Sequence, residues 1–436
     1  MRALVLGYGR SGKAAEALLK ARGAETVVLA DDKQDRIEGE GFDFAVVSPG
    51  IALTHPWIVE AKRRGISLKS ELQLGCEELK RQGWKLLAVT GSKGKSSVVK
   101  VVADAINLAG MKAVACGNYG VPVCEVAEER DLGSGIGDQK WAVVEVSSFM
   151  METTDLPADT FEAAVILNLQ EDHLDRHGSV EVYHGLKRKL LKMAKRQFDL
   201  SPYPDFEALY KAFLDDDVRD FLGGSYFDND VLAPNGVAAL TLMLQAAKLD
   251  RKTARRAFAE FAPLPHRMNL VAEIDGVRYV DDSKATSISA LIAGVKMCRK
   301  DGFRRASNWM RALCAGLGRS RCEQKPSSAP FVRLIAGGLP KGDDPKTALA
   351  TLTERVKKVY LIGQSAEAFC AAWKSAVDCE ICGTMERAVE KAKCEAEKGE
   401  TVLLSPGTAS FDQFKSYGER GEVFARLVKE KDNLNE

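Results

Sequence analysis

Short apolar runs recur along this chain, separated by segments whose apolar residues have helical spacing. The runs predict strands at residues 3–6, 26–30, 44–47, 86–90, 113–116, 142–146, 163–167, 277–280, 332–336, 358–362 and 401–404. Strands that are apolar along their whole length are typical of parallel sheets with helices on both faces. The pattern therefore predicts an α/β protein.

Two breaks in this pattern divide the chain. The alternation of strand and helix restarts after Gly83-Trp84, and Pro263-Leu264-Pro265 forms a second linker. A chain of 436 residues is too long for one core, since a domain has roughly 100 to 200 residues. We therefore expect three domains, at residues 1–82, 83–265 and 266–436.

The first domain carries a glycine pattern that suits a phosphate. Gly7, Gly9 and Gly12 lie between a strand and a helix, and Asp31 follows the next strand. This arrangement predicts a Rossmann-like unit for a ligand with phosphate and ribose groups, of which a nicotinamide cofactor is only one example. The turn Ser48-Pro49-Gly50-Ile51 either lets a ligand approach the backbone or simply ends a strand.

A second phosphate-binding pattern, Thr90-Gly91-Ser92-Lys93-Gly94-Lys95-Ser96-Ser97, joins the strand at 86–90 to a helix. Its glycines let backbone N–H groups face phosphate oxygens, Lys95 adds a positive charge, and the Ser96 hydroxyl suits Mg²⁺. The common form of this motif has glycine where this chain has Val89. We expect an ATP-binding P-loop, and the alternative is a Gly-rich turn with two lysines.

Polar residues follow the next strands of the middle domain, at the edge where α/β sheets bind ligands. Glu145 ends an apolar strand and needs a cation beside it, either the Mg²⁺ of a nucleotide or a lysine. The loop at 168–177 is dense in Asn, Glu, Asp and His. His173 is a candidate ligand for a second divalent ion, whereas His177 and His184 are expected on the surface.

Composition limits the partners. The formal net charge of +1 gives no overall reason to expect nucleic acid or an acidic membrane surface. The N-terminal apolar run is too short for a signal sequence, and no stretch of about 18 apolar residues occurs. We expect a cytoplasmic monomer that acts on small molecules, with no nucleic-acid or membrane partner.

Two other segments are not expected to bind anything. Residues 299–328 are rich in Arg and Lys but have few aromatic residues, which favours a solvated insertion over a nucleic-acid surface. Cys379 and Cys382 form a CxxC pair without a second pair or a nearby histidine, so zinc is not expected there. The cysteines are expected to be reduced and mostly buried.

Five motifs occur in the order found in the Mur ligases of peptidoglycan synthesis, and they span nearly the whole chain. They are Thr90–Ser96, Glu145–Ser148, Asn168 with Glu171–Asp175, Leu264–Arg267 and Asp282–Thr286. The chain resembles this family. Three more segments are similar to the members that add D-glutamate to UDP-N-acetylmuramoyl-L-alanine: Gly7–Gly12, Ser48–Leu53, and Ser405-Pro406 with Ala409–Lys415.

The resemblance implies a Rossmann-like N-terminal domain, a P-loop central domain with a parallel sheet, and a Rossmann-like C-terminal domain. It implies an ATP-dependent ligase that phosphorylates the terminal carboxylate of UDP-N-acetylmuramoyl-L-alanine, after which the amine of D-glutamate attacks the acyl phosphate. The cofactor is Mg²⁺: Ser96 and Glu145 are the implied ligands of one ion, and His173 and a carbamylated Lys187 are those of a second ion. The implied catalytic residues are Lys95, Glu145, His173, Lys187 and Lys284.

The resemblance also implies three sets of binding residues. For ATP they are Gly91, Ser92, Lys93, Gly94, Lys95, Ser96, Ser97, Asn235, Arg267 and Asp282. For the UDP substrate they are Gly9, Arg10, Ser11, Asp31, Ser48, Gly50, Asn118 and Ser147. For D-glutamate they are Thr286, Lys341, Ser410 and Tyr417.

The chain departs from the family in three places. The stretch at 188–234 is short, no His-Asn pair precedes Asn235, and the insertion at 299–328 is unusual. Two other functions stay open on the residues alone. An NAD-dependent oxidoreductase would use the N-terminal glycines but leaves Lys95, Glu145 and His173 unexplained. If the departures have disabled the site, the protein would be a nucleotide-binding module without catalytic activity.

Overall fold

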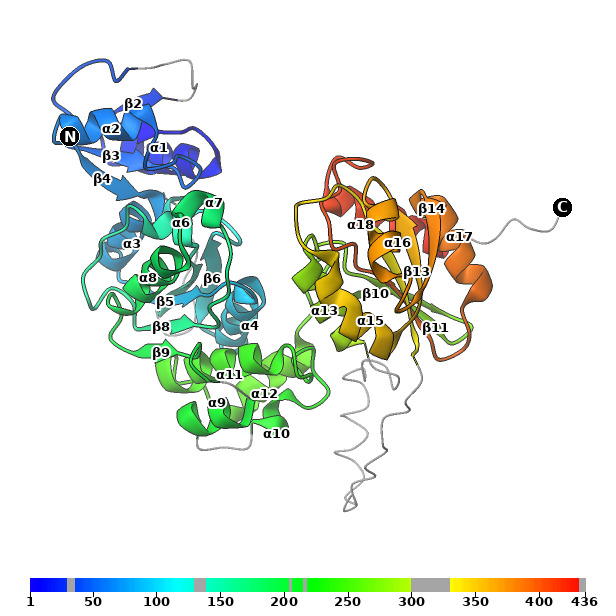
Figure 1. The fold of residues 1–436 in the computed structure, drawn as a ribbon. Helices are drawn as coiled ribbons and strands as arrows, with labels where there is room; N and C mark the ends of the chain where they lie inside the picture. The colour runs from blue at the N-terminus through cyan, green and yellow to red at the C-terminus, as the bar shows by residue number, and fades with distance from the viewer. Residues whose placement is uncertain (30–35, 129–138, 204–205, 215–217, 299–329, 431–436) are drawn as a thin grey trace. The chain divides into compact units, whose positions relative to one another are not determined.

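The computed structural model describes residues 1–29, 36–128, 139–203, 206–214, 218–298 and 330–430 (Figure 1). The chain forms two compact units, residues 1–223 with 232–261 and residues 224–231 with 262–436. Asp31 and the basic insertion at 299–328 lie outside the described residues. No helix of the described part is long and apolar enough to cross a membrane.

The first unit begins with a parallel four-stranded sheet of order β2-β1-β3-β4. Its strands are β1 Arg2–Leu6, β2 Glu25–Leu29, β3 Phe44–Val47 and β4 Ser67–Ser70, and its helices are α1 Arg10–Ala21, α2 Pro56–Arg63 and α3 Glu71–Arg81. Ala3 and Val5 belong to the same core cluster as α1 and α3, whereas Leu4 and Leu6 belong to that of α2. Side chains alternate between the faces of a strand, so an apolar strand is buried on both faces.

A parallel five-stranded sheet of order β6-β7-β5-β8-β9 completes the first unit. Its strands are β5 Lys85–Thr90, β6 Lys112–Gly117, β7 Lys140–Glu145, β8 Ala163–Ile166 and β9 Gln197–Asp199. The helices are α4 Lys95–Leu108, α5 Val123–Glu128, α6 Ser148–Met151, α7 Leu174–His177, α8 Val180–Leu191, α9 Phe206–Phe213, α10 Arg219–Leu222, α11 Ala233–Thr241, the π-helix Leu242–Ala246 and α12 Arg251–Glu260. The helices α9 to α12 form one group (Figure 1). Two of them, α11 and α12, pack against α4.

The second unit holds a six-stranded sheet of order β10-β11-β15-β12-β13-β14, in which only β10 is antiparallel to its neighbour. Its strands are β10 Asn269–Ile274, β11 Val277–Asp281, β12 Val332–Gly337, β13 Val356–Ile362, β14 Asp378–Gly383 and β15 Thr401–Leu404. Its helices are α13 Ile288–Met297, the 3₁₀ turn Pro345–Ala348, α15 Leu349–Arg355, α16 Ala366–Trp373, α17 Met385–Glu395 and α18 Tyr417–Lys429. The α/β prediction is confirmed.

Candidate functional site

The phosphate loop lies between β5 and α4, as its sequence predicts. Gly91 has a φ of 150° and Gly94 a φ of 87°, both in the region that favours glycine. A Cβ on Gly94 would lie only 2.4 Å from Nδ2 of Asn235 in α11. Glycine is therefore required at 94 by both backbone and packing, and Asn235 lies directly against the loop although no His-Asn pair precedes it.

Two lysines converge on one carbonyl of this loop. Lys95 Nζ donates to Gly91 O at 2.9 Å and to Ser92 O at 3.0 Å, and Lys187 Nζ donates to Gly91 O at 2.8 Å. Lys187 is only 1% exposed. Burial, with a smaller contribution from the charge of Lys95, lowers the pKa of Lys187 to about 7. Its amine is therefore neutral in a large fraction of molecules near neutral pH.

The loop after β8 holds the phosphate loop in shape. Asn168 Oδ1 accepts from Lys93 N at 3.0 Å, and Asn168 Nδ2 donates to Lys93 O at 3.0 Å. Its carbonyl accepts from Ser92 N at 3.0 Å, and the Tyr183 hydroxyl donates to Ser92 Oγ at 3.1 Å. Asn168 belongs to one of the family motifs but was given no role, and Tyr183 was not a predicted site residue. Their signal is an amide directly after a buried strand and a tyrosine one helical turn before Lys187.

Glu145 ends β7 with one oxygen satisfied and one not. Its carboxylate is buried, and Oε1 accepts from Asn118 Nδ2 at 2.7 Å. Oε2 has no hydrogen-bond partner among the described residues. A buried carboxylate oxygen without a partner is costly unless a cation completes its surroundings. Glu145 therefore fits the predicted Mg²⁺ site. Its negative charge also raises the pKa of Lys187 slightly, against the larger effect of burial.

His173 precedes α7 and lies beside Tyr183 of α8, the helix that carries Lys187. It has a φ of 54°, its ring packs 4.8 Å from that of Phe149, and it lies 6.2 Å from the ring of Tyr183 in α8. The side chain is 47% exposed, and Nε2 lies 3.7 Å from Oδ2 of Asp172. The exposed imidazole is therefore accessible to a ligand, and it lies near Tyr183, one helical turn before Lys187.

The expectation that His177 lies on the surface is wrong. His177 lies one helical turn after His173, and its Nε2 is 3.0 Å from Ser148 Oγ. Its Nδ1 is 3.3 Å from Oε1 of the buried Glu152. Burial lowers the pKa of His177. His177 ends the single turn of α7 Leu174–His177, and its contacts with Ser148 of α6 and with Glu152 remove its ring from solvent.

The predicted UDP-binding residues occur around loops of both sheets in the first unit. Gly9 caps α1, the exposed Arg10 donates to Gly120 O at 2.9 Å in the loop that carries Asn118, and Ser11 is half-buried. The buried Ser48 donates to Gly7 O at 2.7 Å. In the same region Gly50 is exposed, and Ser147 caps α6 by accepting from Met150 N.

Arg176 adds a contact in this region that the sequence did not reveal. Its Nη2 donates to Ile51 O at 2.6 Å, in the turn that follows Gly50. The same group is paired with the buried Glu152 at 2.6 Å. Arg176 therefore fixes the turn at 48–53 to the loop that carries His173. An arginine between two histidines has no distinctive spacing, which is why it was not predicted.

In the second unit, the predicted lysine lies against an aromatic ring. Lys284 Nζ is 3.8 Å from the ring centre of Tyr417, and Lys284 N donates to His266 O at 3.0 Å. Asp282 accepts from Ser405 Oγ at 2.9 Å, and burial raises the pKa of Asp282 to about 7. The positive charge of the half-buried Arg267 acts in the opposite direction and lowers the pKa of Asp282, but its effect is weaker than that of burial.

The other predicted D-glutamate residues lie on neighbouring loops of this unit. The segment of Lys341 and the segment of Ser410 are joined by two backbone hydrogen bonds between Leu339 and Ala409, at 3.0 and 3.1 Å. Ser410 is buried, Lys341 is exposed and Thr286 is half-buried. All three segments follow strands at the carboxyl edge of the sheet, where α/β folds bind ligands.

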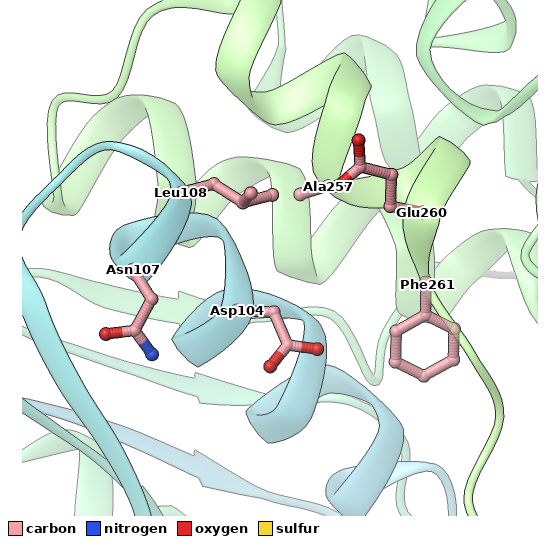
Figure 2. A pocket seen from close by; sticks show the side chains of 6 residues that line it. All are labelled: Asp104, Asn107, Leu108, Ala257, Glu260 and Phe261. Carbon is pink, nitrogen blue, oxygen red and sulfur yellow. The ribbon is translucent and has the colours of Figure 1, made fainter.

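A separate cavity of about 360 Å³ lies between α4 and α12 (Figure 2). It is lined by Asp104, Asn107, Leu108, Ala257, Glu260 and Phe261. Asp104 is nine residues beyond Lys95, so it lies roughly 13 Å along the helix from the phosphate loop. None of the predicted site residues lines this cavity.

A phosphate loop at the carboxyl edge of a parallel sheet, with an unpaired buried carboxylate beside it, defines a nucleotide-binding α/β protein. Family comparison narrows this class. The Mur ligase middle domain matches residues 89–199, and the Mur ligase glutamate ligase domain matches residues 266–407. This chain belongs to the Mur ligase family.

Relatives match almost the whole chain. A UDP-N-acetylmuramoylalanine--D-glutamate ligase from a Synechococcus species is 32% identical over 96% of this chain and 96% of its own. One of the same name from Nitratidesulfovibrio vulgaris is 32% identical over 98% of this chain and 95% of its own.

Solved structures share the fold. MurF ligase from Thermotoga maritima in complex with ADP has a TM-score of 0.55 at 14% identity, covering 92% of this chain and 96% of its own. UDP-N-acetylmuramate-alanine ligase from the same organism has a TM-score of 0.51 at 14% identity, covering 98% of both chains.

Proposed function

We propose that this chain is the ATP-dependent ligase that joins D-glutamate to UDP-N-acetylmuramoyl-L-alanine in peptidoglycan precursor synthesis. The observation that carries this proposal is the similarity to ligases of that name over nearly the full length of both chains. In this proposal residues 1–82 bind the UDP substrate, residues 83–265 bind ATP and residues 266–436 bind the amino acid. Action as a cytoplasmic monomer stays a prediction.

The reaction has two steps. A carboxylate oxygen of the L-alanine residue attacks the γ-phosphorus of ATP, ADP leaves, and an acyl phosphate forms. The neutral amine of D-glutamate then attacks the carbonyl carbon and loses a proton, and phosphate leaves with the oxygen that came from the carboxylate. Negative charge develops on the transferring phosphoryl group and on the carbonyl oxygen, so the protein must supply fixed positive charge and N–H donors.

The phosphate loop supports the first step. Its backbone N–H groups and the N-terminus of α4 are suited to the phosphates of ATP, and Lys95 Nζ lies within this loop, on the carbonyls of Gly91 and Ser92. In our proposal Lys95 stabilises the transferring phosphoryl group. Asn168 holds the loop through two hydrogen bonds with the backbone of Lys93.

The unpaired oxygen of Glu145 supports a divalent cation in the site. Glu145 and Ser96 would hold one Mg²⁺, and His173 and a carbamylated Lys187 would hold a second. Both ions would supply positive charge to the phosphates when bound. Carbamylation needs a neutral amine, because the amine nitrogen attacks CO₂, an N–C bond forms and the nitrogen loses a proton. The low pKa of Lys187, about 7, supplies that neutral amine.

The second unit supports the second step. A dicarboxylate needs donors for both of its acid groups. In our proposal Lys341 and Thr286 bind one carboxylate, and Ser410 with nearby backbone N–H groups binds the other. Lys284, held over the ring of Tyr417, faces the developing oxyanion.

The test is ADP release with UDP-N-acetylmuramoyl-L-alanine and a panel of amino acids that includes D-glutamate and L-glutamate. We expect release that depends on both the UDP substrate and D-glutamate. ADP release that is indifferent to the amino acid, or preference for another amino acid, would contradict the proposal. Fluorescence titration with NADH tests the oxidoreductase hypothesis in parallel, because saturable binding would favour it.

A further inference from the structure

Arg420 in α18 is a fully buried cation that bonds two loops of the second unit. It has 0% exposure. Its Nε donates to Ser283 Oγ at 3.0 Å, and Nη2 donates to Ser283 O at 2.9 Å and to Thr408 O at 3.2 Å. Its Nη1 donates to Ala409 O at 3.2 Å. Each of these acceptors is a neutral oxygen.

This environment is unusual for an arginine. Buried cations are normally paired with a carboxylate, because desolvating a charge is costly. The charges of Asp281 and Asp412 act on Arg420, but the bonds that anchor its guanidinium go to backbone and hydroxyl oxygens. Burial lowers the pKa of Arg420 to about 10, so the group is still charged at neutral pH. The planar fork of arginine can reach several fixed acceptors at once, which a lysine cannot.

The loops that Arg420 joins are those of the proposed amino-acid site. Ser283 directly precedes Lys284, and Ala409 directly precedes Ser410. The two loops also share a hydrogen bond from Gly407 N to Ala285 O at 2.9 Å. If one loop shifts, the hydrogen bonds of the same guanidinium to the other loop are disturbed.

A third loop packs on the same guanidinium. A Cβ on Gly338 would lie 2.4 Å from Ala409 O and 3.2 Å from Nη1 of Arg420. Gly338 lies three residues before Lys341. The close packing of Gly338 against Arg420 therefore also limits where the loop that carries Lys341 can lie. Ser283 Oγ in turn donates to Tyr417 O at 2.8 Å.

We propose that Arg420 is a positioning residue for D-glutamate, which fixes the Lys284 loop against the Ser410 loop. This inference rests on the proposed function for the identity of the amino acid. It assigns Arg420 no contact with the substrate. Its effect is the correct spacing of donors that belong to two separate loops, which a dicarboxylate of one handedness requires.

Arg333 offers a matched control in the same unit. It is also buried, but its Nε is paired with Glu400 at 2.6 Å and its Nη1 donates to the Tyr360 hydroxyl at 2.8 Å. It lies at the start of β12, whereas Lys341 follows the end of that strand. Arg333→Lys therefore reports the general cost of changing a buried arginine.

The experiment compares Arg420→Lys with Arg333→Lys in the full chain. We expect Arg420→Lys to raise the KM for D-glutamate about tenfold or more, as for the loss of a hydrogen bond to a charged group. The KM for ATP should stay within about twofold in both variants. Arg333→Lys should leave the KM for D-glutamate unchanged. Equal changes in the two variants would overturn the proposal.

Amide hydrogen exchange gives a readout that needs no activity. Arg420→Lys should speed exchange in the loops at 282–286 and 407–411, whereas Arg333→Lys should not. Unchanged exchange in both loops would overturn the proposal even if wild-type enzyme did not use D-glutamate. An absence of D-glutamate ligation by the wild type counts against the proposed function instead.

A smaller change guards against a variant that fails to fold. Ser283→Ala removes one acceptor of the guanidinium and alters little volume. It should raise the KM for D-glutamate by a smaller factor, and its effect should not multiply with that of Arg420→Lys if both act through one contact. Independent, multiplicative effects would overturn the idea that the two residues work together.

Discussion

Replacement of Lys187 by methionine should stabilise the protein at low pH while abolishing its activity. Lys187 is buried with its Nζ on Gly91 O at 2.8 Å, and burial lowers its pKa from 10.5 to about 7. At about 1.4 kcal/mol for each pKa unit, keeping the charged form in the folded state costs about 5 kcal/mol. Methionine is similar in length and carries no charge, so Lys187→Met removes this cost.

The sign of the pH dependence follows from the direction of the shift. Between pH 7 and 10.5 the unfolded state binds more protons than the folded state, so the wild type gains stability as pH rises through this window. Below pH 7 both states are protonated and the full cost is present. The lost hydrogen bond to Gly91 O offsets about 1 to 2 kcal/mol. Lys187→Met should therefore be about 3 kcal/mol more stable than wild type near pH 6.5, and no more stable near pH 10.

The assay is urea unfolding in buffer freed of CO₂, followed by tryptophan fluorescence. Trp57, Trp84 and Trp141 are all buried in the first unit and report its unfolding. Lys189→Met is the control, because Lys189 lies two residues further along α8 and donates to Thr154 O at 2.5 Å. A stability difference between Lys187→Met and wild type that does not vary with pH would refute the reasoning. Added bicarbonate should stabilise the wild type and not the variant.

Further predictions concern the two binding regions. Lys95→Ala should lower turnover at least about 10²-fold, as for the loss of one electrostatic stabiliser, and near wild-type ADP release would contradict this. Glu145→Gln should raise the Mg²⁺ concentration needed for half-maximal ADP release and lower turnover at least about 10²-fold, whereas an unchanged Mg²⁺ titration would exclude Glu145 as a ligand. Lys187→Ala should lose activity and regain part of it with added acetate, and full activity without acetate would make Lys187 a structural residue. Lys341→Ala should raise the KM for D-glutamate far more than that for ATP, and equal effects would refute its assignment.

The strands that the sequence did not reveal share one position in the fold. β4, β9, β10 and β14 all lie at the edge of a sheet. An edge strand faces solvent on one side, so it needs no continuous apolar run. β4 reads Ser-Leu-Lys-Ser and β14 reads Asp-Cys-Glu-Ile-Cys-Gly, whereas the central strand β12 is wholly buried. Apolar runs identify the central strands and the edge strands β2 and β6, whereas the missed edge strands lack such a run.

The site divides in a similar way. The loop glycines, Lys95 and Glu145 are recognisable because a strand and a helix with fixed spacing surround them. Asn235 and Lys187 came only from the family resemblance, and the structure brings both to the phosphate loop. Their roles in ATP and metal binding stay predictions.

The two arginines that hold loops through backbone carbonyls carry no such signal. Arg176 donates to the carbonyl of Ile51 and Arg420 to that of Ser283, both far away in sequence. A carbonyl is present at every residue, so nothing in the partner's side chain marks the contact. Only the folded chain shows which arginine meets which loop. This is why Arg420 was not among the predicted site residues.

The most direct test of the central claim follows the oxygen atom of the substrate carboxylate. UDP-N-acetylmuramoyl-L-alanine labelled with heavy oxygen in its carboxylate is incubated with ATP, Mg²⁺ and D-glutamate, and the products are analysed by mass spectrometry. We predict a product extended by one glutamate and one labelled oxygen in each phosphate released. No D-glutamate-dependent product, or phosphate without the label, would contradict ligation through an acyl phosphate.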